Sequence, residues 1–239
     1  MERNVALTYV QRRKRRKRAA WTSLICSIGI TVMLIIAFCV MYVDRFTITI
    51  SGQYLSLVDN EDRNNPTTRL SASPLLKASD TQYYDIPPNI DEGLGSKNTN
   101  SYFAYSFYLI GGDDLKTSRD YSMTMSLADA TNGIDNAVRI MIIKDGIRTI
   151  YAKENEDGSA RQIKYGENHE DTPQIIQDTI KFRTDLDNII IGEYFRISPT
   201  EEQKFTVVMW LDGWDTDNSM KGGTFKTELK FQIIYNEVN

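Results

Sequence analysis

Acidic and amide side chains gather in one short stretch of the chain, WLDGWDTDN at 210–218. They are Asp212, Asp215, Asp217 and Asn218. Hard cations such as Ca²⁺ take six to eight oxygen ligands, and clustered Asp and Asn on a turn can supply some of them. The spacing does not match an EF-hand, because the alternating acidic positions and the closing Glu are missing. This favours a structural interpretation, in which these side chains cap a sharp reversal and Trp214 folds back over the end of the domain.

Residues for enzymatic chemistry are few. The single histidine, His169, lies in the polar stretch GENHEDTP, without a Gly-x-Ser-x-Gly, a Ser-x-x-Lys or a cysteine nucleophile to accompany it. One histidine without nearby cysteines does not make a zinc site. We therefore predict a protein that is not an enzyme, with no catalytic residue and with Ca²⁺ at 210–218 as its one candidate cofactor.

Aromatic side chains suggest a second candidate site. Most of the 13 Tyr, 9 Phe and 3 Trp fall on strand patterns, where aromatic residues usually belong to the core. Tyr83 and Tyr84 differ because they lie in a polar segment that contains Pro87 and Pro88. Loop aromatics can contact a glycan or a partner strand, so we predict binding roles for Tyr83, Tyr84 and Trp214.

The N-terminal part combines a basic block with a long apolar run. Residues 19–43 hold no charged residue, His, Asn, Gln or Pro, and a helix of that length crosses a hydrocarbon core of about 30 Å. Cations that precede such a helix stay on the cytoplasmic side. They are Arg12, Arg13, Lys14, Arg15, Arg16, Lys17 and Arg18. We predict a single-pass signal-anchor with a basic cytoplasmic tail at 1–18, a transmembrane helix at 19–43 and an extracellular domain at the cell surface.

Two alternatives for this region are open. A cleaved signal peptide has an apolar core of about 7–15 residues and a small-x-small site, whereas this run is longer and ends in the bulky FCVMYV. The basic block could bind nucleic acid, although a topology signal that touches anionic lipid headgroups is the favoured interpretation. The predicted partner of this region is the lipid bilayer, and not nucleic acid.

The part after Val43 has a different composition. Its 196 residues contain 20 Lys and Arg against 31 Asp and Glu, a net charge of −11, which argues against nucleic acid as a partner. Both cysteines, Cys26 and Cys39, lie inside the apolar run, so this part has no disulfide, and it has no Asn-x-Ser/Thr acceptor for a glycan. These features favour a bacterium with a single membrane.

Alternating apolar and polar residues predict strands through most of this part. Asp145-Gly146 between two apolar runs is a strong hairpin signal. The predicted strands are 46–58, 102–110, 121–127, 137–144, 147–151, 205–211 and 225–235, and 175–197 is ambiguous between strand and short helix. We predict an all-β fold, an antiparallel, jelly-roll-like β-sandwich over 102–239. Residues 44–101 would supply the first strand and, over 59–101, an irregular stalk or connection.

Three phrases of the sequence carry a resemblance to known proteins. They are NSYFAYSFYLIGGDD, DNAVRIMIIKDGIRTIYAKE and KFTVVMWLDGWDTDNSMKGGTFKTELKF. Over residues 102–235 the chain resembles uncharacterised membrane-anchored surface proteins of Firmicutes with a C-terminal β-sandwich. More distantly it is similar to the camelysin and TasA group of biofilm matrix proteins, which are exported by cleavable signals, whereas the anchor predicted here is retained. The resemblance implies a surface location and a β-sandwich, and it brings no activity.

Two functions fit these features. The first is a non-enzymatic structural or interaction module for adhesion, matrix or envelope assembly, which contacts another surface protein or a second copy through its edge strands. The alternative is a subunit or sensor of an envelope complex, for secretion, conjugation or signalling, that relays its state through the helix. A cytoplasmic tail of 18 residues is too short for a kinase or DNA-binding domain, so signalling would need a cytoplasmic partner.

Overall fold

The computed structural model describes residues 21, 25–33, 46–73, 81–165, 174–183 and 188–235. Contacts between residues divide the chain into two compact units, Met1–Val43 and Asp44–Asn239.

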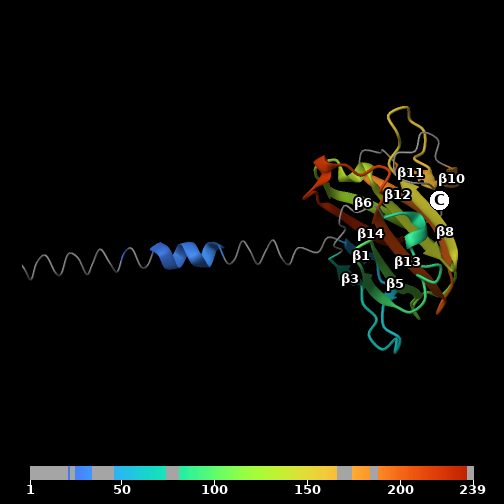
Figure 1. The fold of residues 1–239 in the computed structure, drawn as a ribbon. Helices are drawn as coiled ribbons and strands as arrows, with labels where there is room; N and C mark the ends of the chain where they lie inside the picture. Colours follow the sequence, from blue (N-terminus) through green and yellow to red (C-terminus); the bar gives the residue numbers. More distant parts are fainter. Residues whose placement is uncertain are drawn as a thin grey trace, which may run out of the picture. The chain divides into compact units, whose positions relative to one another are not determined.

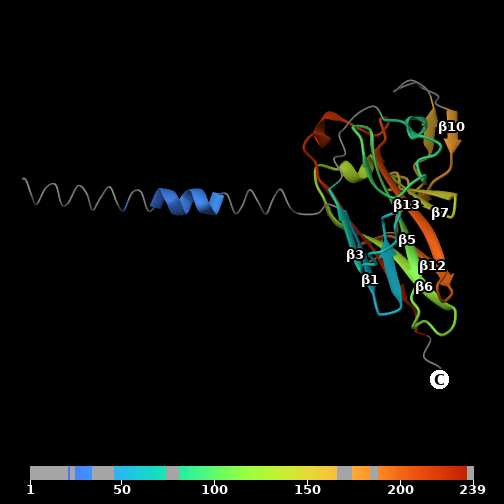
Figure 2. The same ribbon diagram turned by 90° about the horizontal axis from the view of Figure 1, so that it is seen from below.

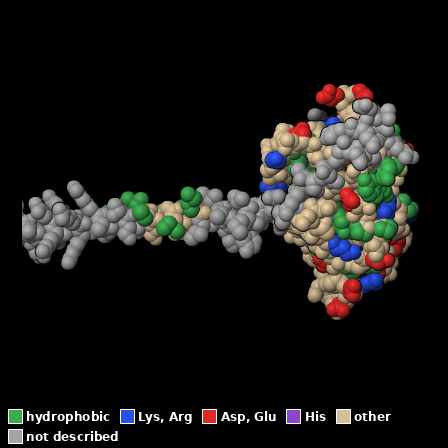
Figure 3. Space-filling view, in the orientation of Figure 1, with side chains coloured by type: hydrophobic (Ala, Val, Ile, Leu, Met, Phe, Trp, Pro, Cys, Tyr) green, Lys and Arg blue, Asp and Glu red, His purple; other side chains and the backbone are tan. Residues whose placement is uncertain are grey.

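The described residues of the first unit, 21 and 25–33, are helical. Their large apolar side chains are exposed, and the exposed fraction ranges from 48% for Val32 to 73% for Met33 (Figure 3). Among the residues that the structure describes, no helix has the length and apolar character needed to span a membrane. The predicted transmembrane helix at 19–43 lies largely outside these residues, as does the basic block at 12–18, and both stay predictions.

The second unit is all-β (Figure 1). One sheet has five strands in the order β12-β6-β14-β1-β3. These strands are β12 (Ile189–Ile197), β6 (Arg119–Ala130), β14 (Phe225–Ile233), β1 (Phe46–Ser51) and β3 (Arg69–Ala72). The all-β prediction is therefore confirmed for the described residues of the second unit.

The second sheet has seven strands, six in the order β11-β8-β7-β13-β5-β2, with β4 also paired to β5. They are β11 (Ile180–Lys181), β8 (Ile147–Ala152), β7 (Val138–Lys144), β13 (Glu202–Leu211), β5 (Tyr102–Gly111), β2 (Leu55–Val58) and β4 (Gly95–Asn98). A two-stranded ladder joins β9 (Ile163–Tyr165) to β10 (Gln174–Gln177). Three short 3₁₀ helices are η1 (Tyr83–Asp85), η2 (Ile134–Asn136) and η3 (Asn218–Met220).

The five- and seven-stranded sheets share one hydrophobic core (Figures 1 and 2). Phe231 of β14 comes from the first sheet, and Phe107 and Phe205 come from β5 and β13 of the second. The Phe205 ring lies 5.2 Å from the Phe231 ring and 5.7 Å from the Phe107 ring, between centroids, and all three side chains are buried. Burial of each such side chain contributes about 1.5–3 kcal/mol, so this aromatic cluster holds the two layers together.

The outer face of the seven-stranded sheet is buried as well. In β13, Val207 and Met209 belong to the shared core, whereas Val208 and Trp210 belong to a second hydrophobic cluster. Ile86 and Ile90, from the segment after η1, are part of that second cluster. A strand covered on both faces has a continuous apolar run instead of an alternating one, as the sequence FTVVMWL shows.

The segment 59–101 differs from the predicted irregular stalk. It contains β3, which pairs with β1, and β4, which pairs with β5. Ile86 and Ile90 are 5% and 2% exposed, so this segment packs on the sheet. The sequence pattern conceals this because its strands, RLSA and GSKN, carry few apolar residues.

Two parallel ladders correct the prediction of an antiparallel, jelly-roll-like sandwich. Most ladders are antiparallel, but β1 runs parallel to β14 and β11 runs parallel to β8. The chain enters the first sheet between its last strand, β14, and β3. Strand direction depends on which distant segment becomes a neighbour, and alternation within one strand does not specify it.

Two local predictions are resolved by turn geometry. Asp145 and Gly146 both have positive φ, 48° and 83°, as a tight two-residue hairpin between β7 and β8 requires. The predicted strand 46–58 is divided near Gly52, whose φ is 117°, into β1 and β2 in different sheets. The ambiguous segment 175–197 contributes β10, β11 and β12, with no helix among its described residues.

Candidate functional site

The loop after β13 has the turn chemistry that the structural interpretation of 210–218 predicts. Asp212 Oδ1 accepts a hydrogen bond from the backbone N of Trp214 at 3.1 Å. Asp217 is the N-cap of η3, and its Oδ1 accepts from the backbone N of Ser219 at 2.6 Å. Both are Asx turns, which fix a sharp reversal by satisfying backbone N–H groups.

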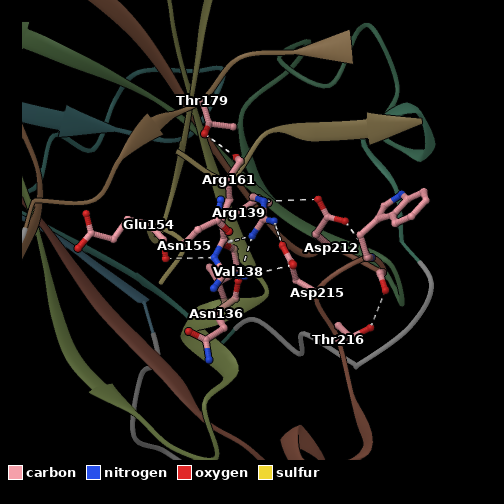
Figure 4. Close-up of polar contacts among 12 residues, drawn as sticks. Asn136, Val138, Arg139, Glu154, Asn155, Arg161, Thr179, Asp212, Asp215 and Thr216 are labelled. Atoms are coloured by element: carbon pink, nitrogen blue, oxygen red, sulfur yellow. Dashed lines mark hydrogen bonds and ion pairs between the residues drawn. The ribbon is translucent and has the colours of Figure 1, made fainter. Parts of the chain in front are cut away.

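The side chain of Arg139 makes most of the polar contacts around this loop (Figure 4). Arg139 lies at the start of β7 and is 0% exposed. Its Nε lies 3.4 Å from Asp212 Oδ2, and its Nη2 donates to Asp215 Oδ2. Its Nη1 donates to the carbonyl oxygens of Asn136 and Val138 at 3.2 and 3.3 Å. The guanidinium is therefore held by two carboxylates and two carbonyls.

Arg161 extends this network to the segment before β9. Its Nη1 lies 3.1 Å from Asp215 Oδ1, and its Nε donates to the carbonyl oxygen of Glu154 at 3.3 Å. Asp215 thus bridges two arginines from separate parts of the chain (Figure 4). Such a network fixes β7, the 212–218 loop and the segment before β9 relative to one another.

Asp212 is almost completely buried, and its ionisation reflects this. Burial raises the pKa of the Asp212 carboxyl above its ordinary value, although the positive charge of Arg139 acts in the opposite direction. A raised carboxyl pKa in the folded state means that this group's contribution to the free energy of unfolding falls as the pH rises through that pKa.

The four residues of the candidate cation loop do not converge on one point. Asp212 and Asp215 face arginines, Asp217 caps η3, and Asn218 begins that helix. In the described part of the chain, no group of three or more His, Cys, Asp or Glu side chains is arranged to hold a metal ion. Binding of Ca²⁺ at this loop stays a prediction. His169 lies outside the described residues.

Two of the predicted binding aromatics, Tyr84 and Trp214, both lie against β9. The Tyr84 ring is 5.5 Å from the Tyr165 ring, between centroids, and the Lys164 ammonium is 5.6 Å from the centroid of Trp214. Tyr83 points elsewhere, because its ring lies 6.3 Å from that of the buried Trp210. It packs against the second hydrophobic cluster.

Exposed apolar side chains occur on both strands of the β9–β10 ladder and on η1. Tyr84 and Tyr165 are each 52% exposed, and in the neighbouring strand β10 Ile175 and Ile176 are 59% and 38% exposed. Figure 2 shows β10 at one end of the second unit. We refer to Tyr84, Tyr165, Ile175 and Ile176 as the hairpin surface.

Several of these residues were missed by reasoning from the sequence. Arg139 lies within the predicted strand 137–144, and a charge within VRIMIIK must find partners when it is buried. Tyr165, Ile175 and Ile176 lie in short strands with no clear alternation. The contact of Tyr165 with Tyr84 and the pairing of β9 with β10 follow only from the three-dimensional fold.

No protein-family model and no curated protein matches this chain. Among solved structures, it is similar to β-glucosidase from Kluyveromyces marxianus in complex with glucose, at 9% identity and a TM-score of 0.26, over 78% of this chain and 16% of that chain. A selenomethionine-labelled β-glucosidase from the same organism gives 10% identity and a TM-score of 0.26, over 78% of this chain and 18% of that chain. The chain thus spans less than a fifth of these β-glucosidase chains, and the likeness is too weak to indicate a shared fold or activity.

Proposed function

We propose that this protein is a single-pass membrane protein that displays a non-enzymatic interaction module at the cell surface. Residues 19–43 would be its transmembrane helix, with the basic block in the cytoplasm and the second unit outside. The observation that carries the binding role is the hairpin surface, where two tyrosines in contact and two isoleucines of the adjoining strand are exposed. The partner would be another envelope protein or a second copy of this chain.

The exposed apolar helix supports the anchoring part of the proposal. Ile25, Ile28 and Ile30 are 62%, 56% and 62% exposed. Transfer of such apolar side chains from water into hydrocarbon is favourable. Thr31, a polar residue in this run, donates its hydroxyl to the carbonyl oxygen of Ser27 at 3.0 Å. A hydroxyl satisfied within the helix is compatible with a lipid environment.

The composition of the hairpin surface supports a protein as the partner. Tyrosine supplies a large, stiff apolar ring and a polar hydroxyl, and it is enriched at the centres of protein interfaces. Covering exposed apolar area removes it from water, which favours association. Asp212 and Asp215 are engaged by arginines, so they are not placed as a catalytic carboxylate pair.

Site-specific photo-crosslinking in intact bacterial cells tests the binding role. A photoreactive phenylalanine analogue would replace Tyr84 or Tyr165 in the full chain, with Tyr194 as the matched control. Tyr194 is also exposed, at 69%, but lies on β12 of the five-stranded sheet. We expect adducts from positions 84 and 165 and not from position 194. A product at twice the chain mass of 27.4 kDa would identify self-association. Equal labelling at all three positions, or none, would contradict the proposed surface.

Cysteine labelling tests the sidedness separately. Both native cysteines lie within 19–43, so a Cys26→Ser/Cys39→Ser background is free of other thiols. In that background, Glu156→Cys on the exposed turn before β9 should react with a membrane-impermeant maleimide on intact cells. Gln11→Cys, next to the basic block, should react only after the cells are lysed. The reverse pattern would overturn the proposed topology.

A further inference from the structure

A cavity of about 310 Å³ opens between the two main sheets, and its lining shares no residue with the hairpin surface. Its walls come from β6 and β12 of the five-stranded sheet and from β7, β8 and β11 of the seven-stranded sheet. β12 and β11 are the end strands of their sheets, so the cavity lies along one open side of the shared core. Its volume falls in the range of small-ligand pockets, about 300–1,000 Å³.

The walls of the cavity are mainly apolar. Met123 and Ile142 form buried parts of the lining, and Phe195 is half-buried. Ile147 and Ile180 also line the cavity and are 74% and 50% exposed. An aliphatic group that entered would contact these side chains and would remove their exposed surface from water.

Glu193 places one carboxylate in this apolar lining. Its Oε1 accepts a hydrogen bond from the hydroxyl of Tyr151 at 2.9 Å, across the two sheets. Burial, together with this bond to Glu193, raises the pKa of the Tyr151 hydroxyl far above its ordinary value. Tyr151 therefore remains a neutral donor and cannot neutralise the carboxylate. Among the described residues, Glu193 Oε2 has no hydrogen-bond or ion-pair partner.

The other charged side chains of the cavity compensate each other. Lys144 Nζ donates to Asp145 Oδ2 at 2.7 Å. The same ammonium lies 5.2 Å from the centroid of the Phe195 ring and 5.9 Å from that of Phe205. Lys144 and Asp145 thus form a neutral pair, and Glu193 leaves the cavity with one net negative charge.

We propose that this cavity binds an aliphatic amine. The alkyl stem would lie against Ile147, Ile180 and Phe195, and the ammonium group would donate to Glu193 Oε2. The net charge of −11 on the part after Val43 attracts cations, and a carboxylate in an apolar wall rejects anions. The amine could be a free diamine or the lysine side chain of another protein, which present the same chemistry. This proposal is independent of the role of the hairpin surface.

Calorimetric titration of the full chain in detergent micelles tests this proposal. The probes are 1,5-diaminopentane, the neutral 1,5-pentanediol and the anionic glutarate, which have the same chain length. We expect the diamine to bind and the other two not to bind. A fourth probe, Nα-acetyl-lysine methylamide, distinguishes a lysine side chain from a free diamine as the natural ligand. Binding of this probe in place of the diamine indicates a lysine side chain. Binding of the diamine alone indicates a free amine.

Two matched variants locate the binding. Glu193→Gln keeps an acceptor for Tyr151 but removes the charge, and it should weaken amine binding by about tenfold or more. Glu228→Gln is the control, because Glu228 also accepts a hydroxyl, from Thr49 at 2.8 Å, but on β14 away from the cavity. The affinity of this control should equal that of the wild type. Absence of binding by both amines, equal binding of the diol, or an unchanged affinity in Glu193→Gln would overturn the proposal.

Discussion

Arg139 is a fully buried cation, and its contacts determine how much its substitution lowers the free energy of unfolding. Two carboxylates, Asp212 and Asp215, and two carbonyls surround the guanidinium. We expect Arg139→Met to lower the free energy of unfolding by about 3–5 kcal/mol, because it leaves Asp212 buried without a cation. Urea denaturation followed by tryptophan fluorescence measures this change.

Two further variants separate a charge effect from general damage to the core. Arg119→Met removes an exposed arginine from β6, and its stability should stay within about 0.5 kcal/mol of the wild type. The double variant Arg139→Met/Asp212→Leu removes both partners and should be more stable than Arg139→Met alone. If the losses of stability in Arg139→Met and in Asp212→Leu alone sum to the loss in the double variant, Arg139 and Asp212 are not energetically coupled.

At the level of elements, the β7–β8 hairpin depends on its two-residue turn. Gly146 has φ of 83°, and a Cβ added there would meet no atom within 4 Å. The cost of a substitution is therefore one of backbone conformation and not of packing. Gly146→Val should destabilise the protein by about 1–3 kcal/mol, since β-branched residues resist positive φ. Gly146→Asn is the control and should lose clearly less, and equal losses in thermal denaturation would exclude this explanation.

Glu201 fixes the turn between β12 and β13 and should make it sensitive to acid. Its Oε1 accepts from Gln203 Nε2 and its Oε2 from the backbone N of Ser198, both at 2.7 Å. The bond from Gln203, followed by that from Ser198, lowers the pKa of Glu201 below its ordinary value. A lowered carboxyl pKa contributes stability above the unfolded value, about 4.3, and this contribution disappears as the pH falls through the folded pKa.

Thermal unfolding of Glu201→Gln between pH 3 and pH 7 measures this contribution. We expect the variant to be less stable than the wild type by about 1 kcal/mol at pH 7, because a charge-assisted acceptor is lost. The difference should shrink as the pH falls below the unfolded pKa, about 4.3, and through the lowered pKa of the folded carboxyl. A difference that is constant over the whole range would show that the charge of Glu201 has no part in it.

Features encoded over a few neighbouring residues were predictable from the sequence. The Asp145-Gly146 hairpin and the Asx turns at Asp212 and Asp217 depend on local chemistry, and the structure confirms them. The strands within 59–101 and the parallel β1–β14 ladder were not predictable, because hydrogen bonds to distant strands create them. The same holds for the site: Arg139 finds its carboxylates only once β7 and β13 are neighbours.

At the level of the whole molecule, the proposed binding features lie on separate elements of the second unit. The hairpin surface is built from η1, β9 and β10, whereas the cavity is built from β6, β7, β8, β11 and β12. The Arg139 network ties β7 to the segment before β9, which leads into the hairpin surface. Arg139→Met should therefore weaken crosslinking from Tyr84 through a loss of structure, even where no ligand contacts Arg139.

The proposed anchor at 19–43 can be tested by placing charged side chains in it. Ile30 lies near the middle of 19–43 and is 62% exposed, so the Ile30→Arg side chain would lie in the hydrocarbon core at a cost of about 2.5–3.5 kcal/mol. Ile28→Arg/Ile30→Arg should reduce the fraction of protein that stays in the membrane pellet after alkaline carbonate extraction. Ile147→Arg/Ile180→Arg is the control, because it adds the same charge at two exposed isoleucines of the second unit. If the double variant remains in the pellet as fully as this control, lipid does not hold residues 19–43, and the proposed surface display fails with it.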